Sequence, residues 1–180
     1  MPHASLLTQH DARGKLNELD WPSGTIGTRR KDRYTPSGLG QSRQTEVRVS
    51  EGGVVIKCEG KEPAWLRPTV QALIELLDLP ENWDSYGARP ISEETAFFAL
   101  QLLDETMQAD TPAPVVVPTN RGGVQLEWHT HGIDLEIEIQ SPGRIYVSYE
   151  DQRLGKEWEA ELTSDLTRLS DALSELSRRR

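Results

Sequence analysis

The chain has 180 residues, a hydrophobic content of 36%, a single cysteine and a formal net charge of −9 at pH 7. One cysteine excludes an internal disulfide and a metal cluster of cysteines within one chain, and no apolar run is long enough to span a bilayer. Since the sequence also begins without the pattern of a secretory signal peptide, we expect a cytoplasmic protein without a membrane segment.

The first 45 residues differ in composition from the rest. They are rich in Gly, Ser, Thr, Pro and Gln and carry an excess of three positive charges, whereas residues 46–180 carry an excess of twelve negative charges. No hydrophobic period of two or 3.6 residues is sustained in this first segment. We therefore predict a flexible or disordered tail over residues 1–45 and a single domain over residues 46–180.

Alternating apolar residues on both sides of Gly52-Gly53 predict a β-hairpin over residues 46–58. Two helices are expected next. Pro68 suits the first turn of a helix that Pro80 ends, and Ser92 is a good N-cap for a second helix that fades near Ala109. The apolar residues of both segments recur at helical spacing, so each helix is expected to bury one face.

The clearest pattern follows a short apolar run at residues 115–117. Strict alternation of apolar and polar residues predicts strands over residues 124–130, 133–139, 144–150 and 156–162. A closing helix is expected from about Ser164, with the terminal arginines at the negative end of its dipole. The predicted fold class is α+β: an antiparallel β-meander of about four to five strands packed on helices, preceded by the hairpin and the flexible tail.

The segment between the two predicted helices, residues 80–90, is long for a helix connection and reads P-E-N-W-D-S-Y-G-A-R-P. Its aromatic residues favour one of two interpretations: a small core of the loop's own, or a binding surface on a rigid scaffold. An exposed arginine in the tight turn at residues 120–123 is a typical interface anchor. The candidate partner-binding residues are Trp83, Asp84, Tyr86, Arg89 and Arg121.

Two motifs, L-P-E-N-W-D-S-Y-G-A and P-T-N-R-G-G-V-Q-L-E-W, resemble a motif pair in a family of uncharacterised bacterial proteins. The resemblance covers roughly residues 70–140 and does not reach the first 45 residues. It implies a bacterial cytosolic protein with a partner-binding role, connected with mobile or defence-type systems. It implies no particular activity.

A metal site is the second hypothesis for the function. Glu127, His129 and His131 alternate along a predicted strand, so all three are expected on its solvated face, where a catalytic zinc needs three such ligands. Asp134 or Glu136 from the next strand is a further carboxylate donor. The alternative is a solvated sheet face that is simply rich in acids, and no cofactor is predicted.

Nucleic-acid binding is the third hypothesis, carried by Arg29, Arg30, Lys31 and Arg33 in the predicted tail. The acidic body itself is expected to repel nucleic acid. Since Cys58 and Ser85 lack the surroundings of a catalytic nucleophile, the leading hypothesis is a non-catalytic protein-binding module. It would act as an accessory, inhibitor or antitoxin-like subunit in a bacterial system, for which a defence role is one option, and its acidic charge favours a basic partner.

Overall fold

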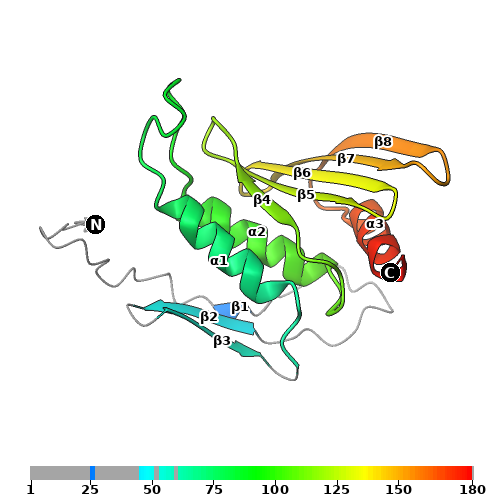
Figure 1. Ribbon diagram of the computed structural model, residues 1–180, viewed down its shortest axis with the longest axis horizontal. Helices are drawn as coiled ribbons and strands as arrows, with labels where there is room; N and C mark the ends of the chain where they lie inside the picture. The colour runs from blue at the N-terminus through cyan, green and yellow to red at the C-terminus, as the bar shows by residue number, and fades with distance from the viewer. Residues whose placement is uncertain (1–24, 27–44, 51–52, 59–60, 180) are drawn as a thin grey trace, which may run out of the picture.

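The structure is a computed structural model that describes residues 25–26, 45–50, 53–58 and 61–179, with side chains described within 61–179. Among the described helices, none is long and apolar enough to cross a membrane. The elements in chain order are β1 (Thr25–Ile26), β2 (Thr45–Ser50), β3 (Gly53–Cys58), α1 (Leu66–Leu77), α2 (Glu93–Thr106), β4 (Val115–Pro118), β5 (Val124–Thr130), β6 (Ile133–Ser141), β7 (Arg144–Asp151), β8 (Lys156–Leu162) and α3 (Thr167–Arg178) (Figure 1).

The larger sheet confirms the predicted meander. Its five strands are ordered β4-β5-β6-β7-β8, and each pairs antiparallel with the next along the chain. Leu126 lies opposite Ile137, which lies opposite Val147, so the apolar positions of successive strands meet on one face. Because side chains alternate between faces, this register buries one face of the sheet and leaves the other in water.

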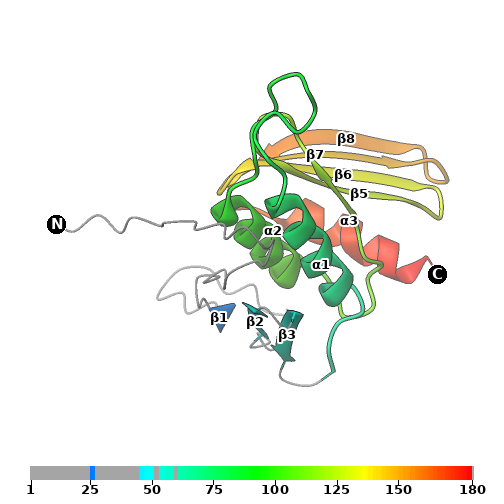
Figure 2. The same cartoon turned by 60° about the vertical axis from the view of Figure 1, so that its left-hand side comes forward.

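All three helices lie on the buried face of the five-stranded sheet (Figure 2). α2 contacts β5 and β6, and it is flanked by α1 and α3. Each fully buried Leu or Ile side chain stabilises the fold by about 1.5–3 kcal/mol. The largest fully buried side chains are Trp65, Leu66, Leu73, Leu100, Leu103, Leu126, Ile133, Leu135, Ile137, Ile139, Ile145 and Leu169. The predicted α+β class, an antiparallel meander on helices, is therefore confirmed.

The predicted start of α2 is correct, its end at Thr106 precedes the predicted end near Ala109, and the other two helices begin at other residues than predicted. The hydroxyl of Ser92 accepts the backbone N–H of Thr95 at 3.2 Å, as an N-cap does. α1 begins two residues before Pro68, which still lies in its first turn. α3 begins at Thr167 instead of Ser164, since the carboxylate of Asp165 accepts the Thr167 N–H at 3.0 Å and holds a turn before the helix.

The predicted hairpin is confirmed by the antiparallel pairing of β2 with β3. β1, from within the predicted tail, pairs with β2 and completes a three-stranded sheet. This small sheet lies on the opposite side of the helices from the larger one, with β3 in contact with α1 (Figures 1 and 2). Outside the two residues of β1 and the first residue of β2, the predicted tail lies outside the described residues.

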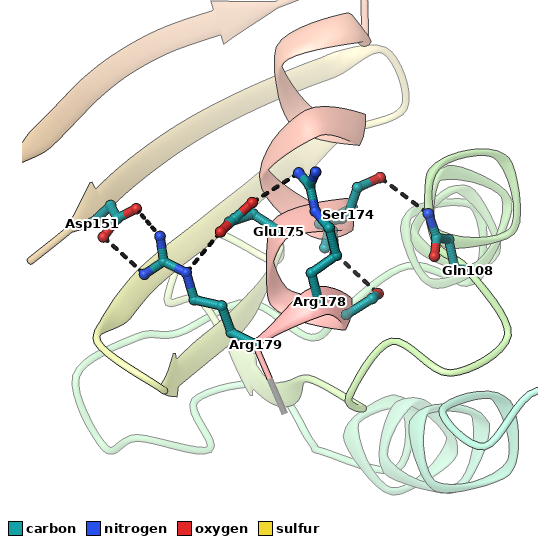
Figure 3. A network of polar contacts seen from close by, with 8 residues as sticks. Gln108, Asp151, Ser174, Glu175, Arg178 and Arg179 are labelled. Carbon is teal, nitrogen blue, oxygen red and sulfur yellow. Dashed lines mark hydrogen bonds and ion pairs between the residues drawn. The ribbon is translucent and has the colours of Figure 1, made fainter. Parts of the chain in front are cut away.

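The end of α3 is held to the sheet by a buried ion pair (Figure 3). Both carboxylate oxygens of Asp151, a residue without solvent exposure, accept from the guanidinium of Arg179. Arg179 also donates to Glu175 at 2.7 Å. The guanidinium of Arg179, followed by the backbone N–H groups of Leu154 and Arg153, lowers the pKa of Asp151 to about 2. The sequence predicted only that the terminal arginines lie at the negative end of the helix dipole. The structure shows that Arg179 also joins α3 to the sheet through its ion pair with Asp151.

Candidate interaction surface

The connection between α1 and α2, residues 80–90, is called the aromatic loop below. Hydrogen bonds within the loop fix its conformation. One carboxylate oxygen of Asp84 accepts the backbone N–H groups of Tyr86 at 2.7 Å and Ala88 at 3.0 Å. The side-chain oxygen of Asn82 accepts the backbone N–H of Gly87 at 2.7 Å. The backbone N–H of Asn82 donates to the carbonyl of Ala88 at 2.7 Å. The N–H of Ala88 and then that of Tyr86 lower the pKa of Asp84.

Three residues of the aromatic loop have positive φ angles: Asn82 at 62°, Ser85 at 66° and Gly87 at 91°. Gly87 adopts the conformation that its sequence position predicts. Asn tolerates the left-handed region well, whereas Ser adopts it at a cost that the surrounding hydrogen bonds offset. The loop is thus held in one strained conformation, which is common where the backbone positions a side chain for a function.

The two aromatic side chains of the loop differ in exposure. Trp83 is half-buried, and its indole N–H donates to the carbonyl of Arg89 at 3.3 Å. Tyr86 is 94% exposed, the highest exposure among the large hydrophobic side chains that the structure describes. The interpretation of both aromatics as a core for the loop is therefore wrong for Tyr86. The apolar residue that the loop does bury is Ala88.

The aromatic loop lies beside the β4–β5 turn, and both project from the same end of the molecule (Figures 1 and 2). The backbone N–H of Arg89 donates to the carbonyl of Asn120 at 3.1 Å. A Cβ on Gly122, which has φ of +85°, would lie 2.9 Å from the carbonyl oxygen of Pro90. Glycine at this position therefore allows the turn to approach the loop closely.

Arg89 and Arg121 come from these two adjacent segments, and both are exposed. None of the ion pairs within residues 61–179 involves the guanidinium of Arg89 or Arg121. Arg67, Arg144, Arg178 and Arg179 are each paired with a carboxylate, whereas Arg153, which is also exposed, has no ion pair among the described side chains. The exposed Tyr86 therefore lies on segments with two arginines and two carboxylates, Glu81 and Asp84, so the loop and the turn together carry no excess of either charge. The structure thus brings the five predicted partner-binding residues to one end of the fold.

The solvated face of the five-stranded sheet is strongly acidic. Glu127 lies directly opposite Glu136, and Glu150 lies opposite both Asp134 and Glu157. Like charges in directly opposed positions destabilise a sheet, so folding alone does not favour this arrangement. The acidic residues of this face, called the acidic face below, are Glu127, Asp134, Glu136, Glu138, Glu150, Glu157, Glu159 and Glu161.

The predicted metal ligands do not form a three-residue site. His129 lies between two carboxylates, with Nδ1 at 2.9 Å from Asp134 and Nε2 at 3.4 Å from Glu127. His131 has φ of 56° and lies in the β5–β6 turn, not on the strand. Among the described residues, no group of three or more His, Cys, Asp or Glu side chains could hold a metal ion. The hydrogen bond to Asp134, with a smaller contribution from Glu127, raises the pKa of His129.

The predicted nucleic-acid contacts, Arg29, Arg30, Lys31 and Arg33, lie outside the described residues.

The sequence did not lead us to predict the structural roles of Asn82 and Asp151. Asn82 closes the aromatic loop, and an Asn before a Gly-containing turn is a recognisable signal for positive φ. Asp151 continues the inward alternation of Ile145, Val147 and Tyr149, so an acid at that position signalled a buried partner.

A scan against protein-family models finds no match to the chain, and searches of the curated proteins and of the solved structures find none either.

Proposed function

We propose that the chain is a non-catalytic protein-binding module whose partner docks on the aromatic loop and the adjoining β4–β5 turn. In this proposal it serves as an accessory, inhibitor or antitoxin-like subunit of a bacterial system. Trp83 and Asp84 support the loop from within, whereas Tyr86, Arg89 and Arg121 contact the partner. Tyrosine and arginine are among the residue types that dominate the binding energy of protein interfaces.

The exposure of Tyr86 is the observation that carries the proposal. A large aromatic ring that is 94% exposed contributes almost no burial to the fold, yet the loop that presents it is fixed by the side chains of Asn82 and Asp84. A side chain presented on a preformed loop binds with little loss of conformational entropy. Burial of the Tyr86 ring in a partner is therefore expected to stabilise a complex more than any other single contact of the loop.

The acidic face favours a partner with a basic surface. Its cross-strand carboxylates repel one another, and a cationic surface would relieve that repulsion on binding. The charged residues steer association and select partners more than they add affinity, so the tyrosine is expected to supply the binding energy.

The experiment is a pulldown of the tagged full-length protein from its native cells, with stoichiometry measured by quantitative mass spectrometry. The wild-type protein is compared with Tyr86→Ala and with Leu154→Ala. Leu154 is the matched control: it is a large hydrophobic side chain, 56% exposed, in the turn between β7 and β8 at the opposite end of the sheet (Figure 1). A stoichiometric partner that is lost with Tyr86→Ala and kept with Leu154→Ala supports the proposal.

Two results would contradict it. A stoichiometric partner that binds Tyr86→Ala as well as it binds wild type would place the interface elsewhere. Turnover of a substrate by the purified protein would show an enzyme. Because exposed side chains contribute little to stability, both variants should keep the wild-type melting temperature, so a loss of binding reports the contact and not unfolding.

A further inference from the structure

We propose that β8, the outermost strand of the five-stranded sheet, is a docking site where an extended basic segment of a partner protein adds to the sheet. β8 is last in the strand order, and β7 is its one neighbour among the described strands. Every second residue of such a strand directs its backbone N–H and C=O groups away from the sheet. No described element lies beyond β8 (Figures 1 and 2). This inference goes beyond the proposed function, which concerns the aromatic loop beside the β4–β5 turn.

The two edges of the five-stranded sheet differ. β4 has four residues, contains Pro118, which lacks a backbone N–H, and lies against α1. β8 has seven residues without a proline, and its register with β7 is unbroken from Lys156 to Leu162. Short length, proline, bulges and covering elements are the usual means that keep an edge strand from pairing. β8 lacks them among the described residues, so it is the edge to which a strand can be added.

A further strand would also complete the burial of the inward side chains of β8. The inward side chains of β6 are fully buried, whereas Trp158 and Ala160 of β8 are only half-buried. The indole of Trp158 stacks on Tyr149 with 5.7 Å between the ring centroids, and the guanidinium carbon of Arg168 lies 4.2 Å from the ring centroid. The ring is therefore held in place, and apolar side chains of an added strand can cover its remaining exposed surface.

The open face at this edge selects a basic strand. Glu157, Glu159 and Glu161 occupy every second position of β8, and Glu150 of β7 lies directly opposite Glu157. On this face of the two strands, these four carboxylates stand against a single cation, Arg144, whose exposed ion pair with Glu161 spans 3.4 Å. Opposite charges in directly facing positions of neighbouring strands stabilise a sheet. Lysine or arginine is therefore expected at every second position of the added strand.

The other side of the edge requires a different kind of residue. Lys156 shares the side of Trp158 and Ala160, and Arg168 lies over Trp158 on that side. Basic residues there would meet like charges, whereas apolar residues would cover the half-buried side chains. The occupant is thus an extended segment in which basic and apolar residues alternate.

A second copy of β8 does not fit this edge. Antiparallel pairing of two such strands, with the helices of both copies on one side, would place Glu159 opposite Glu159 and Glu157 opposite Glu161 of the other copy. Like charges in directly opposed positions are destabilising. The glutamates therefore disfavour pairing between identical edges and favour a cationic strand.

The test uses the full-length protein and a labelled peptide of about eight residues that alternates lysine and valine, with binding followed by fluorescence anisotropy at about 0.15 M salt. Two control peptides have the same composition and charge. One groups its lysines at one end, and the other is N-methylated throughout and cannot donate backbone hydrogen bonds. Both controls should bind at least about tenfold more weakly, because strand addition requires the alternation and the backbone ladder.

A matched pair of variants locates the contact. Glu157→Lys, Glu159→Lys and Glu161→Lys together should weaken binding of the alternating peptide at least about tenfold. The control combines Glu127→Lys, Glu136→Lys and Glu138→Lys, the same change of charge on β5 and β6. A strand beyond β8 would lie about 14 Å from β6, which exceeds the screening length of about 8 Å at this salt concentration. The control should therefore weaken binding less than about threefold, and Tyr86→Ala should leave it unchanged.

Hydrogen exchange followed by NMR reports the backbone contact itself. In the free protein, every second amide of β8 is expected to exchange fast, since it has no partner on β7. Saturation with the alternating peptide should slow these amides and leave those of β4 as they are.

Four outcomes overturn the proposal: no binding at about 1 mM peptide, equal binding of the control peptides, equal losses in the two charge-reversed variants, or protection that misses β8. None of them touches the proposed function, since Tyr86 and the aromatic loop lie beside the other edge of the sheet (Figure 1). Loss of the pulldown partner without loss of the peptide, in turn, would leave the strand-addition site standing.

Discussion

Two turns of this fold are built around an aspartate that accepts two backbone N–H groups. Asp84 accepts from Tyr86 and Ala88 in the aromatic loop, and Asp151 accepts from Arg153 and Leu154 after β7. Their surroundings differ. Asp151 is fully buried and paired with Arg179, whereas Asp84 is partly exposed and has no cationic partner among the described residues.

This difference gives the two aspartates different roles: Asp151 stabilises the fold, and Asp84 positions Tyr86. A buried carboxylate requires a cation beside it. The pair of Asp151 and Arg179 joins the sheet to the end of α3, so breaking the pair is expected to destabilise the whole fold. Asp84 shapes a loop that water can reach, and its hydrogen bonds determine only where Tyr86 is held. The same chemical device thus supports the scaffold at one end of the molecule and a candidate binding loop at the other.

The largest effect is expected from Asp151→Asn. The amide keeps one oxygen as an acceptor for the turn but removes the buried charge that pairs with Arg179, whose guanidinium keeps only Glu175 as an ionic partner among the described residues. We expect the melting temperature to fall by about 10 °C in thermal unfolding followed by circular dichroism. Arg179→Lys should lose less than Arg179→Ala, because the ammonium keeps the charge. A shift of under about 2 °C for Asp151→Asn would show that the pair does not hold the fold together.

Acid should weaken the same contact in the wild type. The pKa of Asp151 is lowered from 3.8 to about 2 in the folded protein, chiefly by Arg179. A carboxylate whose pKa is lower in the folded than in the unfolded protein stabilises the fold fully at pH values above its unfolded-state pKa. This stabilisation is lost as the pH falls through the folded-state pKa. The urea midpoint of the wild type should therefore approach that of Asp151→Asn between about pH 4 and pH 2. A constant difference between the two curves over that window would contradict the assignment.

A smaller effect is expected where the aromatic loop meets the β4–β5 turn. Gly122→Ala and Gly143→Ala both place a side chain at positive φ, at +85° and +80°, which costs about 1–2 kcal/mol in each case. Only the methyl at Gly122 would lie 2.9 Å from the Pro90 carbonyl oxygen, whereas nothing lies within 4 Å at Gly143. Gly122→Ala should therefore unfold at lower urea and speed hydrogen exchange at Arg89. Equal midpoints for the two variants would show that the loop is not tightly docked.

The fold could be predicted from the sequence because the alternation of apolar and polar residues identifies the strands and their buried face. Ile133, Leu135, Ile137 and Ile139 repeat with a period of two, and a slip by one residue would turn them all into water. Helix ends were less accessible, since α3 begins after a turn that the Asp165 carboxylate sets by hydrogen bonding.

The candidate site was only partly accessible for a physical reason. Hydrophobicity and spacing suggest that Trp83 and Tyr86 both pack, but the hydrogen bonds of Asn82 and Asp84 determine which ring faces water. The alternation of Glu127, His129 and His131 predicted a third ligand on the strand, but the positive φ of His131 places it in the turn. The pairing of Asp151 with Arg179 joins residues 28 positions apart, which no local pattern specifies.

The smallest effect on stability is expected from Asp84→Asn, the same substitution in the other turn. Asparagine keeps one oxygen that can accept the N–H groups of Tyr86 and Ala88, and no buried cation is left unpaired, so the melting temperature should change by less than about 2 °C. The neutral acceptor makes weaker hydrogen bonds than the carboxylate. Hydrogen exchange at Tyr86 and Ala88 should therefore accelerate, while exchange in β6 stays as it is. If exchange in β6 accelerated equally, Asp84 would be part of the scaffold, and the division between a stabilising aspartate and a presenting one would fail.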